Sequence, residues 1–236
     1  MSTYRFWKKL NELYSWLIIV FFSFILLIGL WQCYDSYYIF DHAVNDDIIR
    51  YKPHSHGEDD LIREESPITN EMVAWLTIDG TNIDYPVMQG SDNLHFLNTD
   101  PLGEYSLTGS IFLDCRCSPD FSDSYSLIYG HHMDYGKMFG TLDDFLSKTY
   151  LQDHSTGTLM VGRNGEEKYD LRVFAAMEVS AGEKTVFDLN ADNICQYIHD
   201  NAAVLNTESN EKIVALSTCS DANSASRVVV FCYITE

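Results

Sequence analysis

Three residues at the ends of predicted strands have side chains that together could catalyse acyl transfer: Cys219, His131 and Arg227. Cys219 follows the apolar-rich stretch 212–216, Arg227 opens another such stretch, and His131 ends the stretch 125–129. An ionised thiol attacks an amide carbonyl, an imidazole gives a proton to the departing amine, and a guanidinium binds the oxyanion. These residue types indicate acyl transfer with a cysteine nucleophile.

The elements around these residues are expected to bring them to one end of a sheet. Turn-forming residues lie between Cys219 and Arg227, so a hairpin places the two side by side. Gly130 permits a backbone geometry that aims the side chain of His131 off its strand end. Neighbours along a strand face opposite ways, so His131 and His132 cannot both face Cys219. We choose His131, because it directly follows Gly130.

The chain outside its N-terminal part is predicted to be mainly β with flanking helices. Short strand-like runs alternate with turn residues, and eight such runs with few helices are typical of a closed β-barrel. The runs cover residues 73–78, 83–88, 110–114, 125–130, 157–162, 168–179, 212–217 and 227–234.

Helices are expected in three of the intervening segments. They cover residues 91–98, 138–147 and 189–204, the last with Asp188 or Asn190 as its N-terminal cap.

Residues 14–34 are predicted to form a transmembrane anchor. They carry no charge and contain the apolar run Trp16–Trp31, and about 20 such residues span a bilayer. The three basic residues before the run keep the N-terminus cytoplasmic by the positive-inside rule; they are Arg5, Lys8 and Lys9. A cleaved signal peptide is the competing interpretation, although no small-residue cleavage site follows the run.

The anchor divides the chain into four predicted parts. Residues 1–13 form a cytoplasmic N-terminus, 14–34 the anchor, 35–70 a polar linker with N-terminal helices, and 71–236 one extracellular catalytic domain. After residue 13 the chain has 12 basic and 34 acidic residues, a net charge of −22. Such a surface repels nucleic acid, which is therefore excluded as a partner.

The cysteines predict neither a disulfide framework nor a metal centre. Cys115 and Cys117 are too far apart along an extended strand for good disulfide geometry, and no CxxC or Cys/His ligand pattern occurs. A zinc site that combines these two cysteines with His131 and His132 is the remaining alternative. The expectation is that the protein has no metal and no cofactor.

Several segments together resemble the sortases, the transpeptidases that anchor proteins to Gram-positive cell walls. The sequence Leu216–Cys219, the arginine eight positions after the cysteine (Arg227) and the segment Tyr129–His131 match the family's signature. Residues 75–90 and 109–114 resemble the opening strands of the family's barrel. The resemblance implies an eight-stranded sortase-type β-barrel.

The likeness covers about residues 70–234 and is strongest to class B. The long insertion between the strand that ends near 180 and the strand that starts near 212 resembles a helix-bearing loop that class B sortases place over the substrate groove.

The resemblance also implies a set of substrate-binding residues. Asn93, Leu97, Tyr129 and Ser217 match family positions that line the groove or contact the sorting signal. Ser220 replaces a residue that is often acidic in the family.

The mechanism that the resemblance implies has two steps. Cys219 attacks the carbonyl of Thr in an Asn-Pro-x-Thr-x (NPxTx) type sorting signal, Arg227 stabilises the oxyanion, and His131 protonates the leaving amine. A peptidoglycan amine then opens the thioester. The implied partners are secreted proteins with a C-terminal sorting signal, peptidoglycan or its lipid-linked precursor, and the cell membrane.

Other functions fit the sequence less well. A cysteine phosphatase needs a phosphate-binding loop and a helix after its cysteine, and a papain-like hydrolase places its cysteine before its histidine. A pilin-polymerising, class C-like sortase and a non-catalytic anchored binding domain stay open as alternatives.

Overall fold

The computed structural model describes residues 2–42, 48–53, 66–189, 193–206, 211–219 and 226–235. The chain divides into two compact units, Met1–His42 and Ala43–Glu236.

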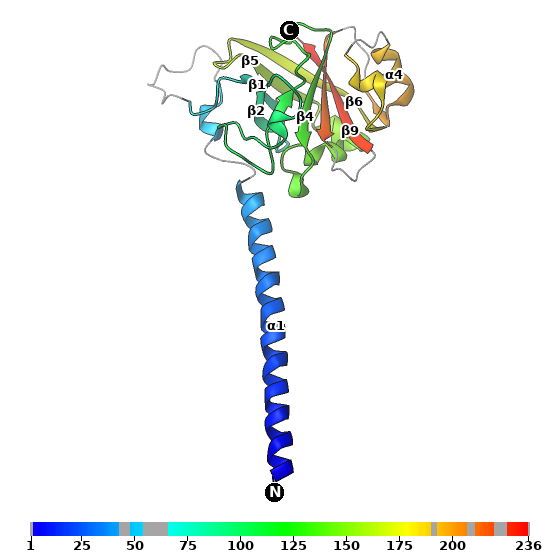
Figure 1. Ribbon diagram of the computed structural model, residues 1–236. Coiled ribbons are helices and arrows are strands. Elements are labelled where there is room, and N and C mark those ends of the chain that lie inside the picture. The colour runs from blue at the N-terminus through cyan, green and yellow to red at the C-terminus, as the bar shows by residue number, and fades with distance from the viewer. Residues whose placement is uncertain are drawn as a thin grey trace. The chain divides into compact units, whose positions relative to one another are not determined.

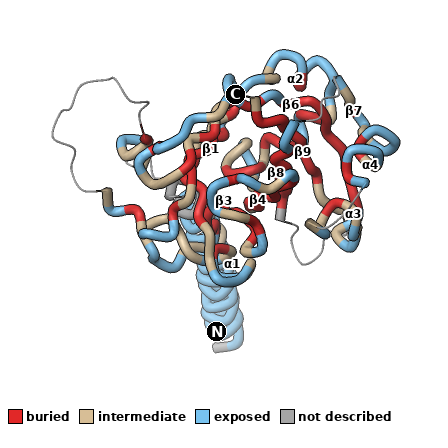
Figure 2. Tube along the Cα trace, turned by 90° about the horizontal axis from the view of Figure 1, so that it is seen from above, coloured by how far each residue is buried: buried red, intermediate tan, exposed pale blue. Residues whose placement is uncertain are grey.

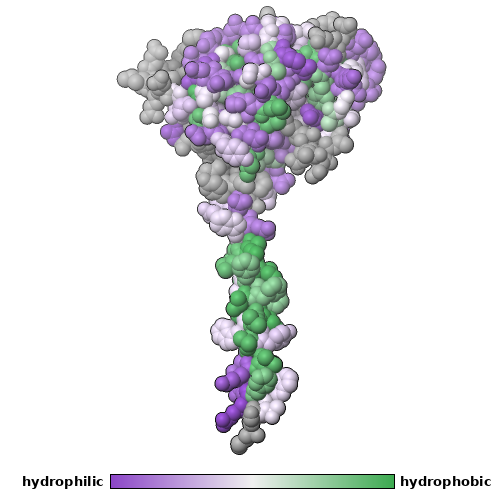
Figure 3. Space-filling model, viewed as in Figure 1, coloured by the Kyte–Doolittle hydropathy of each residue, from purple (hydrophilic) through white to green (hydrophobic). Residues whose placement is uncertain are grey.

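The first unit is a single helix, α1 (Ser2–His42). Its stretch Thr3–Asp35 contains an 18-residue window with a mean hydropathy of 2.5 and no buried residue. In the described part of the chain, α1 is the one helix that is long and apolar enough to cross a membrane. Figure 3 shows the apolar side chains gathered along this helix. The predicted anchor 14–34 lies inside it, and the helix continues to His42, so its last turns are formed by residues assigned to the polar linker.

The second unit contains a closed β-barrel (Figure 1), which confirms the predicted fold. Eight strands follow one another in the order β5-β1-β2-β3-β4-β8-β9-β6, and β6 closes the barrel on β5. Among the described residues, the short strand β7 pairs only with β6. The strands are β1 (Met72–Ile78), β2 (Asp84–Met88), β3 (Ile111–Leu113), β4 (Tyr125–His131), β5 (Thr156–Val161), β6 (Glu167–Ser180), β7 (Val204–Leu205), β8 (Ile213–Cys219) and β9 (Ser226–Thr235).

The central strands are buried on both faces. Along β8, Val214 and Leu216 pack into one hydrophobic cluster, whereas Ile213 and Ala215 pack into a second. Figure 2 shows the same continuous burial along β4, β8 and β9. Because both faces are covered, these strands are continuous apolar runs rather than alternating ones, and burial of each large side chain contributes about 1.5–3 kcal/mol.

The helices of this unit are short, and most are 3-10 turns. They are η1 (Ile48–Tyr51), η2 (His95–Leu97), η3 (Asp134–Gly136), η4 (Gly140–Leu146), α2 (Lys148–Asp153), α3 (Lys184–Phe187) and α4 (Ile194–Asn201).

The predicted helix 91–98 is wrong, because only His95–Leu97 forms a 3-10 turn. The Asp92 carboxylate accepts the backbone N–H groups of Leu94 and His95, at 2.8 and 2.9 Å, and so offers the backbone an alternative to helix.

The predicted helix 138–147 begins later, at Gly140, as a 3-10 helix, because Met138 has a φ of 52°.

The long helix predicted at 189–204 is wrong: among the described residues of this range only α4 is helical, since α3 already ends at Phe187 and Val204 begins β7. Asp188 directly follows α3 and does not begin a helix, and Asn193 precedes α4 without a side-chain cap. The other proposed cap, Asn190, lies outside the described residues.

Candidate active site

The backbones of the three predicted catalytic residues meet on adjacent strands. β4 and β8 run parallel, with His131 in register with Cys219, and both residues end their strands. β8 and β9 are antiparallel with Ser217 opposite Val229, and this register continued by two residues sets Arg227 opposite Cys219. Carboxyl ends of parallel strands lie at the same edge of a sheet, so one edge carries all three residues.

His131 is held by the loop between β2 and β3. Its Nε2 lies 2.8 Å from the carbonyl oxygen of Leu97, and since a carbonyl oxygen only accepts, Nε2 carries the hydrogen in this contact. The neighbouring His132 turns elsewhere, with its Nε2 2.8 Å from the Asp143 carboxylate. The two adjacent histidines therefore contact different parts of the molecule.

Close packing, rather than the predicted special backbone geometry, requires glycine at position 130. Its φ is not in the left-handed region, so the expected special backbone geometry is wrong. A Cβ at this position would lie 2.4 Å from Ile111 Cδ1 and 2.7 Å from Phe139 Cδ2. Glycine is required here because two side chains pack directly on the strand next to His131.

Arg227 is half-buried and is supported by an aromatic ring. Its guanidinium carbon lies 5.0 Å from the centroid of the Phe187 ring, at the end of α3, a distance at which a cation–π contact contributes about 0.5–2 kcal/mol. Its Nε is buried and has no hydrogen-bond partner among the described residues. A buried donor without a partner costs about 1–3 kcal/mol, which a bound oxyanion would offset.

A buried carboxylate that the sequence did not single out organises the opposite side of the site. Asp114 has no exposed side-chain surface and accepts hydrogen bonds from Asn93 Nδ2 at 2.9 Å and from the Tyr129 hydroxyl at 3.2 Å. Arg116 donates to both carboxylate oxygens, through Nε at 2.9 Å and through Nη2 at 2.8 Å. Burial acts to raise the pKa of Asp114, but the hydrogen bonds and charge of Arg116 outweigh it and lower the pKa below its ordinary value.

Two predicted substrate-binding residues are thus fixed by Asp114. Asn93 also accepts the backbone N–H of Cys115 at 2.8 Å, so both ends of its amide are engaged. The pKa of Tyr129 is raised by burial first, then by the charge of Asp114, whereas the nearby charge of Arg227 lowers it. The phenol therefore stays protonated at neutral pH and acts as a donor.

The other two predicted substrate-binding residues differ in exposure. Leu97 is half-buried and gives its carbonyl oxygen to His131. Ser217 is fully buried within β8, and its Oγ donates to the Thr218 carbonyl oxygen at 3.2 Å.

A signal for Asp114 is present in the sequence. It is an acidic residue directly after the apolar run Ile111–Leu113, with an arginine two positions later. An ionisable residue that continues a buried strand needs a partner, and Arg116 is the nearest one along the chain.

The described residues contain no group of three or more His, Cys, Asp or Glu side chains that could hold a metal ion. Burial raises the pKa of the Cys117 and Cys232 thiols to about 12, so both stay protonated and inert.

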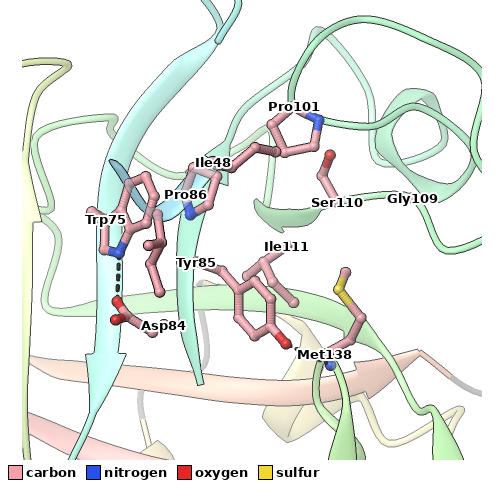
Figure 4. A pocket seen from close by; sticks show the side chains of 11 residues that line it. Ile48, Trp75, Asp84, Tyr85, Pro86, Pro101, Gly109, Ser110, Ile111 and Met138 are labelled. Atoms are coloured by element: carbon pink, nitrogen blue, oxygen red, sulfur yellow. Dashed lines mark hydrogen bonds between the residues drawn. The ribbon is translucent and has the colours of Figure 1, made fainter. Parts of the chain in front are cut away.

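A small apolar pocket of about 50 Å³ lies elsewhere on the barrel (Figure 4), and none of the seven predicted site residues lines it. Ile48 of η1 covers it, and Trp75 on its wall donates to Asp84 at 2.6 Å. Lys52 donates to the same carboxylate at 2.8 Å, which fastens the segment before the barrel to β2.

Known proteins with similar sequences and structures share this arrangement of strands. Residues 76–235 match the sequence profile of the sortase domain family. The chain is 32% identical to Sortase B of Staphylococcus aureus over 179 residues, 72% of each chain. A class B sortase of Streptococcus pyogenes involved in pilus biogenesis superimposes with a TM-score of 0.64 at 35% identity, covering 70% of this chain and 92% of that one. The complex of Staphylococcus aureus sortase B with a substrate gives a TM-score of 0.64 at 28% identity, covering 72% of this chain and 82% of that one.

Proposed function

The chain belongs to the sortase family, in its class B, and we propose that it is a membrane-anchored cysteine transpeptidase that cleaves an NPxTx-type sorting signal after Thr and joins the product to a peptidoglycan amine. The observation that carries the proposal is the register of β4, β8 and β9, which supports His131, Cys219 and Arg227 acting as one unit.

In the first step Cys219 is the nucleophile. Its thiolate attacks the Thr carbonyl carbon, and the charge that develops on the carbonyl oxygen is stabilised by Arg227. The buried Nε of Arg227 supports this role, because no described residue satisfies that donor. The C–N bond then breaks, His131 gives its proton to the departing amine, and a thioester on Cys219 remains.

In the second step an amine of the cell wall opens the thioester. The amine nitrogen bonds to the carbonyl carbon, neutral His131 takes the proton from that nitrogen, and the C–S bond breaks to release the Cys219 thiolate. The product is a new amide. Water in place of the amine gives hydrolysis as a side reaction.

Recognition of the sorting signal is assigned to Asn93, Leu97, Tyr129 and Ser217. The hydrogen bonds of Asn93 and Tyr129 to Asp114 support this assignment, because they fix both side chains before substrate arrives and so reduce the entropy lost on binding. Ser217 is buried in β8, two residues before the proposed nucleophile, so a contact with the sorting signal requires that the signal reach the end of this strand.

Membrane attachment is assigned to residues 14–34 within α1, with residues 1–13 cytoplasmic and the catalytic domain, residues 71–236, extracellular. The apolar window within Thr3–Asp35 supports the attachment, and the three basic residues before the predicted anchor support the orientation. Anchoring would hold enzyme, secreted substrate and lipid-linked wall precursor in one thin layer, which raises their effective concentrations.

A second candidate function is pilin polymerisation. It is favoured by one observation, the 35% identity to a Streptococcus pyogenes class B sortase that is involved in pilus biogenesis. The two functions differ in the acceptor, which is a wall amine in one case and an amine of a pilin subunit in the other.

The test is product analysis of the full-length protein in detergent micelles with an NPxTx peptide library. Each reaction contains either a short peptidoglycan-type amine or a lysine-bearing peptide as acceptor. Cleavage after Thr and transfer to the wall-type amine are expected. Preferential transfer to the lysine peptide would favour the pilin function, and intact peptides with a folded protein would contradict both.

A further inference from the structure

A continuous series of contacts connects Asp114 with Arg227 across the site. Asp114 binds Arg116 and Tyr129, and Arg116 Nη2 also donates to the backbone carbonyl of Phe187 at 3.0 Å. The Phe187 ring in turn lies against the guanidinium of Arg227. The carboxylate and the guanidinium are therefore connected through two side chains and one helix end.

The C-terminal end of α3, which carries Phe187, is attached to the rest of the domain at two points. α3 has only four residues and begins with the Glu183 carboxylate, which accepts the Thr185 N–H at 2.9 Å. At its other end, the Val186 carbonyl accepts from the Tyr125 hydroxyl at 2.9 Å, and the next carbonyl, that of Phe187, accepts from Arg116. The last carbonyls of a helix lack partners within it, so these two donors fix where Phe187 stands.

We propose that Asp114 and Arg116 are positioning residues for the oxyanion-binding side chain of Arg227, which they reach through Phe187. The proposal rests on the proposed function for the role of Arg227 itself. Asp114 sets the orientation of the Arg116 guanidinium by a two-point contact, and Arg116 holds the Phe187 backbone so that the ring supports Arg227.

The geometry explains why position 116 needs an arginine rather than a lysine. The Arg116 fork bonds two carboxylate oxygens and a carbonyl oxygen on a different element, Phe187 of α3, at the same time. An ammonium group is a compact point charge that can satisfy Asp114 but not both elements in this fixed geometry. An oxyanion donor that is displaced by about 1 Å loses much of its effect on the transition state.

The first test measures acylation kinetics of the full-length protein with a sorting-signal peptide. Arg116→Met is expected to lower the acylation rate constant by about 10-fold to 100-fold, with KM changed by less than about threefold. Arg116→Lys is expected to restore thermal stability but not the rate constant. Alkylation of Cys219 by iodoacetamide, which requires no oxyanion donor, is expected to proceed at the wild-type rate in both variants.

Arg163→Met is the matched control. Like Arg116, Arg163 donates to the backbone of a distant segment: it lies between β5 and β6 and donates to the backbone carbonyls of Thr69 and Ser66, at 2.8 and 3.0 Å. Loss of these bonds is expected to lower stability without lowering the acylation rate constant. Equal losses of rate in the Arg116 and Arg163 variants would overturn the proposal, because they would mean a general effect of stability.

A second measurement decides the proposal without any turnover. In the protein labelled with ¹⁵N-arginine, the Nε–H proton of Arg227 is expected to show a ring-current shift from Phe187, identified by its loss in Phe187→Leu. Arg116→Met is expected to move this resonance toward its position in Phe187→Leu, and Arg163→Met to leave it in place. An unmoved resonance in Arg116→Met would overturn the positioning role. If wild-type protein acylates no peptide, the proposed function fails, and this measurement still decides the inference.

Discussion

One side of the proposed active site is held by backbone ladders, and the other by side-chain hydrogen bonds around a single carboxylate. On the strand side, formed by the ends of β4, β8 and β9, parallel and antiparallel pairing brings His131, Cys219 and Arg227 to one edge. On the carboxylate side, Asp114 binds Arg116, two residues away, together with Asn93 and Tyr129 from more distant segments. Backbone ladders tolerate most side-chain changes, whereas a buried charge network depends on each member.

The largest expected change in activity concerns the histidine pair on the strand side. His131→Ala is expected to lower kcat/KM by about 10³-fold or more, because it removes the proton donor to the leaving amine. His132→Ala, which loses only the exposed contact to Asp143, is expected to stay within about threefold of wild type. Steady-state kinetics with a sorting-signal peptide check both, and a larger loss for His132→Ala would reverse the assignment.

The carboxylate side is tested by Asp114→Asn. The change removes the buried partner of the Arg116 charge. Because Arg116 itself is half-exposed, the free energy of unfolding is expected to fall by about 1–3 kcal/mol at neutral pH. Urea denaturation measures this difference. An unfolding free energy equal to that of wild type would show that the network does not stabilise the domain.

The carboxylate of Asp114 also makes the stability of the folded protein depend on pH. The pKa of Asp114 is lower in the folded protein than its ordinary value, so its contribution to stability is complete above that ordinary value, about 3.9, and is lost as pH falls through the folded pKa. Wild type is expected to lose stability more steeply than Asp114→Asn between about pH 4 and the acid limit. Parallel thermal-melting profiles for the two proteins in this range would contradict the account.

Packing on the strand side is tested by Gly130→Ala. The new methyl group would lie within 2.7 Å of Ile111 and Phe139, and relief of this overlap is expected to cost about 1–3 kcal/mol of unfolding free energy. Gly182→Ala is the control, because the nearest heavy atom lies 4.0 Å from its added Cβ. Chemical denaturation of both variants measures the difference, and equal stabilities would argue against tight packing behind His131.

The smallest effect concerns cysteines away from the strand side. Because burial raises the pKa of Cys117 and Cys232 to about 12, neither thiol is expected to be alkylated by iodoacetamide at pH 8 in the native protein. Peptide mapping after native and denatured labelling measures this directly. Native labelling of Cys232 at the denatured rate would show that the barrel opens far more readily than its burial indicates.

The strand side could be predicted from the sequence because its signals are local. Apolar runs such as 125–129 between turn residues gave the strands, and three chemically distinct residues at run ends indicated the site. The barrel itself is confirmed. The catalytic roles of His131, Cys219 and Arg227 remain predictions that the experiments above test.

The carboxylate side could not be predicted in the same way, because its contacts join distant segments through side chains. Asn93 and Asp114 are 21 residues apart, and Arg116 and Phe187 are 71 apart. The spacing of apolar residues along the sequence does not predict such pairs of distant side chains. Local hydrogen bonds also explain why the helix predicted at 91–98 is wrong, because the Asp92 carboxylate caps a turn there. The glycine before His131 allows close packing rather than the special backbone geometry that was predicted.

The most direct test of the central claim is intact-protein mass spectrometry of the full-length enzyme after rapid mixing with an NPxTx peptide. The account predicts a transient adduct with the mass of the acyl portion up to Thr, carried by Cys219, absent in Cys219→Ala and removed by added amine. A protein that is folded and alkylated by iodoacetamide at Cys219, yet forms no such adduct with any peptide of the library, would contradict it.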